Sequence, residues 1–452
     1  MKTNVKTPAP RTHGGSVAAR ITPEQELRRT VMACLLWETE AYESGVKIAD
    51  RIAALVPQVD PFVVATIAVQ ARTEQHLRHV PLLIVREMCR HKKHLPHVAN
   101  TLEAVCQRAD EPAEFLSLYW AGGKCPVAKQ VKLGLARAFG RFGEYNLAKY
   151  NRDGAVKLRD VMFICHPKPC SDEQAALFKK VAENNLATPD TWEVELSAST
   201  DKKASWTRLL DEKVLGAMAL LRNLRNMTQA GVDEQKVRAA LKECKPDRVL
   251  PFRFVTAAQH NPRLEPELEE LMFKCLAGRE KLPGKTVLIV DVSGSMGAKL
   301  SLKSELRRFD VAAALCMLAR ELCEQPVVYA TAGDDYRRVH ATLLLPARRG
   351  FAMRDAVIKA ANSLGGGGIF LHQCMEYIAR AERSADRIIV LTDEQDCDLV
   401  NKPTSCNPWG ITNYLINVAS AKNGIGYGEW RHIDGWSEAC LDYIQAVEES
   451  NN

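Results

Sequence analysis

One short stretch, residues 286–296, constrains the fold of this chain more than any other. Residues 287–290 form an unbroken aliphatic run, which predicts a strand buried on both faces of a parallel sheet. The run ends at Asp291, and Ser293 and Ser295 follow at alternate positions. Ligands gather at the carboxyl ends of strands in open α/β sheets. The stretch therefore predicts a site in which one carboxylate and two hydroxyls share a tight loop.

The oxygen atoms of this loop suit a hard divalent cation. Mg²⁺ prefers oxygen ligands in near-octahedral geometry and keeps several waters. A second strand, predicted at 387–392, ends at Asp393 and offers a further carboxylate. We therefore expect Mg²⁺ or another divalent cation at Asp291, Ser293, Ser295 and Asp393. The phrase resembles the metal-ion-dependent adhesion site of von Willebrand factor A domains, and a plain strand followed by a Ser/Gly turn is the alternative.

The expected metal site departs from this resemblance at one position. A domains take a threonine ligand from a Gly-Gly-Thr phrase in a second loop. Here residues 365–369 read Gly-Gly-Gly-Gly-Ile and provide no hydroxyl. A water molecule is expected to fill that position, since the carboxylates supply most of the attraction for the cation.

The chain is expected to have two domains after a flexible arm at residues 1–20. Residues 21–280 show helical patterning with hardly any strand signal, and their rhythm is typical of a HEAT-like α-solenoid. Residues 285–452 alternate strands and helices, which predicts a doubly wound parallel sheet. The fold class is therefore α + α/β. The expected helices of the first domain include one that begins at Thr22, and then 41–55, 62–75, 81–90, 95–107, 129–139 and 211–227.

The second domain has the following expected elements. After the strand at 286–291 comes a helix at 302–323, with Arg307, Arg308 and Asp310 on its outer side. The later elements are strands at 327–331, 339–344 (an antiparallel edge), 387–392 and 414–417, and helices at 353–363, 372–383 and 437–448.

Positive charge is concentrated in one segment of the helical domain. The chain has a net charge of +6, yet residues 124–168 alone hold ten Lys and Arg against three Asp and Glu. Solvated helix faces usually interleave both signs, so this segment indicates a polyanion as partner. Solvated outer faces without a ligand are the alternative interpretation.

A second polar group occurs at the end of the predicted helix 211–227. Arg222, Asn223, Arg225 and Asn226 crowd together there. Guanidinium and amide groups bind phosphates and the edges of unpaired bases. The alternative is that these side chains cap the carbonyls of a helix end.

The order of these features resembles that of the Ro/TROVE family of RNA-binding proteins. The matching phrases are Lys-Leu-Arg-Asp-Val at 157–161, His-Pro-Lys-Pro at 166–169, Leu-Leu-Arg-Asn-Leu-Arg-Asn-Met at 220–227, Phe-Arg-Phe at 252–254, and the strand ends at 290–296 and 391–393. The resemblance implies a ring of HEAT-like helices closed by the A domain. It also implies a small noncoding Y RNA on a basic outer surface and the single-stranded 3′ ends of misfolded RNAs in a central hole, with a role in RNA quality control or the stress response.

The resemblance assigns residues to these two RNA sites. The expected cavity residues are Arg222, Arg225 and Asn226. His166 either contacts RNA or is a helix-end residue satisfied by a carbonyl. The expected residues of the outer surface are Lys129, Lys132, Arg137, Lys149, Arg152, Lys157, Arg159, His166 and Lys168.

Two other functions compete with RNA binding. In the first, the A domain is a metal-dependent adhesion or assembly module and the helices are its scaffold. In the second, the acidic cluster Asp393, Glu394, Asp396 and Asp398 is the active site of a nuclease. We expect no enzyme, because no general base stands beside a nucleophile. No stretch is apolar over the length that a membrane span needs, so we expect no membrane span. We also expect a cytoplasmic protein and a monomer, with an exoribonuclease as a possible further partner.

Overall fold

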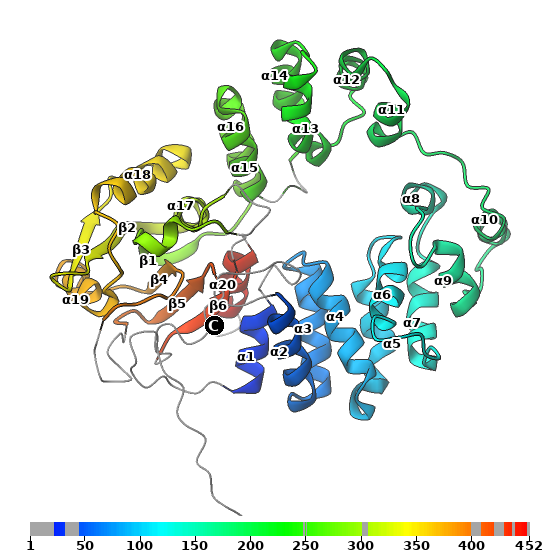
Figure 1. Cartoon of the computed structure of the whole chain (residues 1–452), viewed down its shortest axis with the longest axis horizontal. Coiled ribbons are helices and arrows are strands. Elements are labelled where there is room, and N and C mark those ends of the chain that lie inside the picture. Colours follow the sequence, from blue (N-terminus) through cyan, green and yellow to red (C-terminus); the bar gives the residue numbers. More distant parts are fainter. Residues whose placement is uncertain are drawn as a thin grey trace, which may run out of the picture. The chain divides into compact units, whose positions relative to one another are not determined.

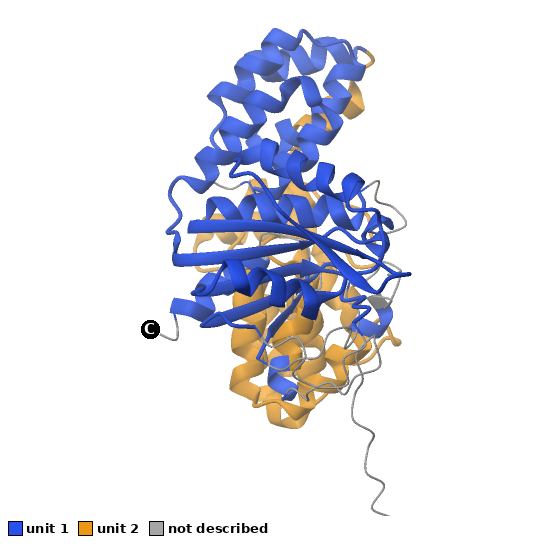
Figure 2. Cartoon of the chain, turned by 90° about the vertical axis from the view of Figure 1, so that its left-hand side faces the viewer, with its two compact units in different colours: residues 1–25, 32–48, 201–452 blue, residues 26–31, 49–200 orange. Residues whose placement is uncertain are grey.

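The computed structural model describes residues 22–31, 45–246, 249, 251–300, 306–398, 408–419, 429–435 and 439–449. The chain divides into two compact units, coloured separately in Figure 2. Unit 1 holds Met1–Gln25, Met32–Ile48 and Asp201–Asn452, and unit 2 holds Glu26–Val31 and Ala49–Thr200. The predicted arm at 1–20 lies outside the described residues. None of the described helices is both long and apolar enough to cross a membrane.

Unit 2 is built from helices whose ends are set by local signals. The first helix, whose start belongs to unit 1, begins where predicted with a capping box: the Thr22 N–H donates to Gln25 Oε1 at 2.9 Å, and the Gln25 N–H donates to Thr22 Oγ1 at 3.2 Å. The described helices up to residue 200 are α1 (Pro23–Val31), α2 (Gly45–Leu55), α3 (Pro61–Thr73), α4 (His79–Cys89), α5 (Leu95–Val105), α6 (Glu111–Tyr119), α7 (Lys129–Phe139), α8 (Glu144–Tyr150), α9 (Leu158–Cys165), α10 (Asp172–Ala182) and α11 (Trp192–Ala198), with short 3₁₀ turns at Val56–Gln58 and Lys92–His94.

These helices pack as stacked neighbours, as the blue and cyan part of Figure 1 shows. Helix α3 packs against α4 and α5, α5 against α7, and α7 against α9, while α4 packs against α6 and α6 against α9. Such an arrangement is typical of helix pairs that share one apolar layer. The HEAT-like repeat and the closure into a ring stay predictions.

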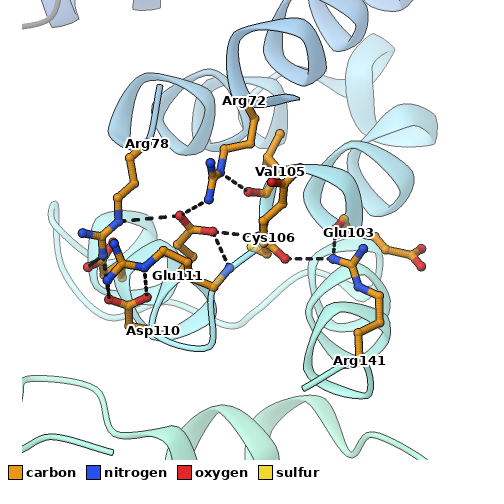
Figure 3. Close-up of polar contacts among 11 residues, drawn as sticks. Arg72, Arg78, Glu103, Val105, Cys106, Asp110, Glu111 and Arg141 are labelled. Carbon is orange, nitrogen blue, oxygen red and sulfur yellow. Dashed lines mark hydrogen bonds and ion pairs between the residues drawn. The ribbon is translucent and has the colours of Figure 1, made fainter. Parts of the chain in front are cut away.

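A buried ionic network fixes four of these helices to one another (Figure 3). Glu111, at the start of α6, is fully buried and accepts a hydrogen bond from the Arg72 guanidinium of α3 at 2.8 Å. Its other oxygen accepts from the N–H groups of Gln107 at 2.7 Å and Arg108 at 2.9 Å. Arg72 Nε also donates to the carbonyl of Val105, the last residue of α5, at 3.1 Å. One carboxylate thus joins α6 to α3 and to the loop after α5.

Two further arginines extend this network. Arg78, just before α4, pairs with Asp110 at 2.7 Å and also contacts Glu114 of α6. Arg141, after α7, donates to the carbonyls of Glu103 and Cys106. Arg141 belongs to the basic segment, but its guanidinium serves the packing of α5 and α7.

In unit 1, helices α12 to α16 precede the sheet. Gly216 caps α13, so the helix predicted at 211–227 is wrong in its first part: Asp211 ends α12, and α13 begins only at Ala217. The helices are α12 (Lys202–Asp211), α13 (Ala217–Gln229), α14 (Glu234–Glu243), α15 (Phe252–His260) and α16 (Glu265–Leu276), with a 3₁₀ turn at Pro262–Leu264. The described chain changes from helices alone to alternating strands and helices between α16 and the first strand. The predicted domain boundary at 280–285 stays a prediction.

A six-stranded sheet follows in the order β3-β2-β1-β4-β5-β6. All neighbouring strands are parallel except β2 and β3, so the predicted antiparallel edge is confirmed. The α + α/β class is confirmed, with a mixed sheet in place of a wholly parallel one. The elements are β1 (Leu282–Asp291), α17 (Arg308–Glu321), β2 (Cys323–Asp334), β3 (Val339–Leu344), α18 (Gly350–Ser363), α19 (Leu371–Ala381), β4 (Arg387–Thr392), β5 (Thr412–Asn417), β6 (Arg431–Asp434) and α20 (Ala439–Glu449), with a 3₁₀ turn at Gly294–Gly297.

Strand β1 lies between β2 and β4 and is buried on both faces, as predicted. Val287 and Ile289 belong to a core cluster with Leu371 and Ile378 of α19. The alternate residues of β1 are also fully buried, and α17 packs against β1, β2 and β4. Strand order reverses between β1 and β4, so the ends of these two strands meet at the point where α/β folds bind ligands.

We predict that Glu111→Ala destabilises unit 2 by about 3–5 kcal/mol, because the buried guanidinium of Arg72 loses its carboxylate. The free energy of unfolding, measured by urea denaturation of the full chain, checks this. As a control, Glu144→Ala removes the exposed pair with Lys180, whose atoms lie 2.9 Å apart, and is expected to cost less than about 1 kcal/mol. Equal effects of the two substitutions would contradict the role assigned to Glu111.

Candidate functional site

The residues predicted for the outer RNA surface gather on α7, α8, α9 and the loops beside them. Helix α7 packs against α9. Burial raises the pKa of the Cys165 thiol at the end of α9, and the positive charge of Lys132 on α7 opposes this effect in part. Eight of the nine predicted side chains are exposed and Lys149 is half-buried. We call this set the basic face: Lys129, Lys132, Arg137, Lys149, Arg152, Lys157, Arg159, His166 and Lys168.

The charges of the basic face differ in whether they are already paired. Arg137 donates to Asn100 Oδ1 at 2.9 Å and lies 3.5 Å from Glu103. Lys157 pairs with Asp153 at 2.6 Å, and the Lys149 ammonium lies 5.9 Å from the centre of the Tyr145 ring. The remaining cations form no ion pair with any residue that the structure describes, and their charge is available to a ligand: Lys129, Lys132, Arg152, Arg159 and Lys168.

His166 has a structural role in its backbone and an exposed side chain. It ends α9 in the left-handed conformation, with φ of 49° and ψ of 58°, and its N–H donates to the Met162 carbonyl at 2.9 Å. The helix-end interpretation is therefore right for the backbone. The imidazole itself is exposed beside Lys168 and can still reach a ligand.

The predicted cavity residues lie on one face of α13. Arg222, Arg225 and Asn226 are exposed and follow helical spacing, whereas Leu221 and Leu224 are buried. The Asn226 amide donates to Asn223 Oδ1 at 2.9 Å. The structure therefore brings two guanidiniums and one anchored amide together on the surface of this helix.

The residues predicted to hold a metal converge at the ends of β1 and β4. Asp291 Oδ1 accepts from the Ser293 N–H at 2.9 Å, and Asp291 Oδ2 accepts from Thr392 Oγ1 at 2.6 Å. The hydroxyls of Ser293 and Ser295 lie 3.2 Å apart. Burial, followed by the neighbouring Asp393, raises the pKa of Asp291 to about 7. Two carboxylates and two hydroxyls thus share one buried corner of the sheet.

Arg308 is part of this corner, which corrects the sequence analysis. We expected it on the outer side of a helix, but its exposure is 2%, and Nη1 lies 2.8 Å from Asp393 Oδ2 and 3.3 Å from the Ser295 carbonyl. The cause is the start of α17: the Arg307 N–H donates to Asp310 Oδ2 at 2.8 Å, so the helix begins at Arg308. The spacing of Arg307 and Asp310 was the sequence signal for this start.

The glycine loop at 365–368 packs directly on the Asp291 loop. The Gly294 N–H donates to the Gly367 carbonyl at 3.2 Å, and a Cβ at Gly294 would lie 2.3 Å from the Gly366 carbonyl oxygen. A Cβ at Gly367 would lie 2.1 Å from the Gly333 oxygen, and one at Gly368 would lie 2.3 Å from Cys397 Sγ. Only backbone fits between the two loops.

The donor set fits a hard cation in chemistry, but one carboxylate is already occupied. Asp291, Ser293 and Ser295 offer oxygen atoms, whereas Asp393 is paired with Arg308. Among the described residues, no cluster of three or more His, Cys, Asp and Glu is arranged to hold a metal. A divalent cation at this corner would therefore depend on hydroxyl and water oxygens, and it would compete with a guanidinium.

The acidic residues after Asp393 hold the sheet edge together. Glu394 is fully buried, accepts from Asn417 Nδ2 at 2.9 Å and lies 3.1 Å from His432 Nδ1. Asp396 accepts from the Leu371 N–H at 3.1 Å, and burial raises its pKa to about 7. These contacts join the β4 loop to β5, β6 and α19. The sequence analysis missed β6, and with it His432.

Comparisons with known proteins find a family model, two relatives and a solved structure that are similar to parts or all of this chain. Residues 182–340 match the family model of the TROVE domain, a range that includes α13 and the Asp291 loop but not the basic face. The rat telomerase protein component 1 is 22% identical over 357 residues, covering 57% of this chain and 14% of that protein. The mouse protein of the same name is 35% identical over 89 residues, covering 18% of this chain and 3% of that protein. The chain thus spans at most 14% of these relatives.

A solved structure shares the fold. The crystal structure of the Ro (Rsr) protein of Deinococcus radiodurans matches with a TM-score of 0.64 at 18% identity, over 95% of this chain and 100% of that chain. Sequence and fold agree with the resemblance found in the phrases at 220–227 and 290–296. Residues 182–340 are thus similar to the TROVE domain, and the fold of the chain is similar to that of a Ro protein.

Proposed function

We propose that this chain is an RNA-binding protein that acts without catalysis. One observation carries the proposal: five exposed cations of the basic face, among them Lys132 and Arg159, have no ion-pair partner among the described residues. Phosphates are the ligands that such a surface neutralises, and release of their counterions makes the affinity depend on salt. The similarity of residues 182–340 to the TROVE domain supports the same proposal.

We propose that two RNA elements bind at two places. A small structured RNA binds the basic face, where lysine and arginine contact phosphates with little sequence preference. Single-stranded ends bind the exposed face of α13, where Arg222, Arg225 and Asn226 offer donors to phosphates and base edges. We therefore propose that the protein acts in RNA quality control or the stress response. An assembly module, the competing function, would leave both surfaces without RNA.

We also propose that Asp291, Ser293 and Ser295 hold a divalent cation such as Mg²⁺, with Asp393 shared between the cation and Arg308. When bound, the cation supplies a positive charge that offsets the buried carboxylates. The Arg308 guanidinium already neutralises one of these two carboxylates. The cation therefore meets a smaller net negative charge and binds weakly.

We predict that replacing Lys132, Arg137 and Arg159 together by Glu abolishes measurable binding of a structured RNA, because three phosphate contacts become repulsive. Filter binding at two salt concentrations measures this, and the wild-type affinity should fall steeply with salt. The matched control replaces Arg348, Lys359 and Arg383, which are exposed in the sheet-containing part of unit 1, and changes the net charge equally. If the first triple variant binds like the control, the basic face is not the RNA site.

We predict that Mg²⁺ raises the melting temperature of the wild-type protein but not that of Asp291→Ala, because a ligand that binds only the folded state stabilises it. In Arg308→Met, a nearby positive charge is lost and Asp393 is free, so the same rise should occur at about tenfold lower Mg²⁺ concentration. Thermal melts over a Mg²⁺ series, with EDTA as reference, measure both effects.

The control for this series is Arg307→Met, which removes the exposed neighbouring arginine and should behave like the wild type. Two results would refute the metal proposal: an equal Mg²⁺ effect in the wild type and Asp291→Ala, or no effect in either the wild type or Arg308→Met.

A further inference from the structure

An aromatic side chain stands exposed within the basic face. Phe163 lies on α9, and its exposure is 51%, although the other apolar residues Leu158, Val161 and Met162 of this helix are buried. The ring makes no aromatic or cation–π contact with any described residue. The packing of unit 2 therefore does not explain why a large apolar ring occupies this position.

The neighbours of Phe163 are cationic. Arg159 lies four residues earlier on the same exposed face of α9, and His166 follows three residues later at the end of the helix. Helix α7, which carries the exposed Lys132, packs against α9. Arg159 and Lys132 form no ion pair with the residues that the structure describes, so both charges stay available next to the ring.

The acidic residues near Arg159 in the sequence are engaged by Lys157. Asp160, the residue after Arg159, is half-buried and accepts from the Lys157 N–H at 2.9 Å, which caps α9. Asp153 pairs with Lys157 at 2.6 Å. The surface around Phe163 thus combines an exposed ring with unpaired positive charge.

A ring among cations is the arrangement by which proteins hold unpaired nucleotides. Bases stack on aromatic side chains, and the flanking phosphates contact lysine and arginine. We propose that Phe163 is a base-stacking residue: an unpaired base of the bound RNA lies against its ring, while Arg159 and Lys132 contact the adjacent phosphates. This inference rests on the proposed RNA-binding function and adds to it that the basic face takes single-stranded as well as structured RNA.

The test compares two RNA probes and four substitutions in the full-length protein. One probe is a fluorescein-labelled stem-loop with an oligouridine tail, and the other is the same stem-loop without the tail. Phe163→Leu keeps an apolar side chain but removes the ring, and it should weaken binding of the tailed probe about tenfold. Binding of the tailless probe should not change. Phe163→Trp keeps a stacking surface and should bind the tailed probe at least as tightly as the wild type.

The matched control is Phe62→Leu. Phe62 is another exposed phenylalanine of unit 2, with an exposure of 68%, on α3, and its nearest ring partner is His97 at 6.3 Å. This substitution should leave both affinities unchanged. The salt dependence gives a second readout, because loss of a stacking ring should leave the salt slope of Phe163→Leu unchanged, whereas Arg159→Ala should reduce it.

Photocrosslinking gives a direct readout of stacking. An iodouridine in the tail should crosslink to Phe163 in the wild-type protein, as identified by mass spectrometry of the digested complex. Equal affinity of Phe163→Leu and wild type for the tailed probe overturns the stacking role, and so does an equal loss for both probes. If the charge-reversed triple variant still binds RNA, the proposed function itself fails; if that variant loses RNA while Phe163→Leu does not, only the stacking role fails.

Discussion

The structure depends on the pairing of charges that are buried away from water. An isolated buried charge is costly, and a pair is tolerated only when its geometry is good. In the sheet, Asp393 is fully buried and the Arg308 guanidinium lies 2.8 Å from it. Among the helices, Glu111 is fully buried and holds Arg72. Because each pair joins elements that are distant in sequence, the same interactions that neutralise buried charge also fix the packing of helices and strands.

Local patterns predicted the elements that local interactions determine. Strand β4 (Arg387–Thr392) and helix α7 (Lys129–Phe139) have the bounds expected from the sequence. Aliphatic runs and helical spacing carry this information within a few residues. The family resemblance assigned lysines and arginines of α7 and α9 to an outer surface, and these side chains are exposed. It did not predict which are paired, because the partners of Arg137 lie on α5, more than thirty positions away.

Long-range contacts account for what the sequence analysis missed. Strand β6 has four residues, Arg431–Asp434, and its polar residues His432 and Asp434 are buried through long-range contacts such as that of His432 with Glu394. The helix predicted at 211–227 overlooked the break before Gly216. Arg308 reads as a surface charge in the sequence, and only the position of Asp393, 85 residues later, makes it a buried one.

The close packing of the glycine loop limits how the metal-binding corner can change. A threonine at any of the four glycines would need room for its side chain and a suitable backbone conformation. Gly365 and Gly366 have room, but their φ values of 84° and 69° are unfavourable for a β-branched residue. At Gly367 and Gly368 the backbone permits a side chain, but Gly333 and Cys397 occupy the space. None of these four glycines therefore accepts a threonine unless the backbone or the facing residues also change.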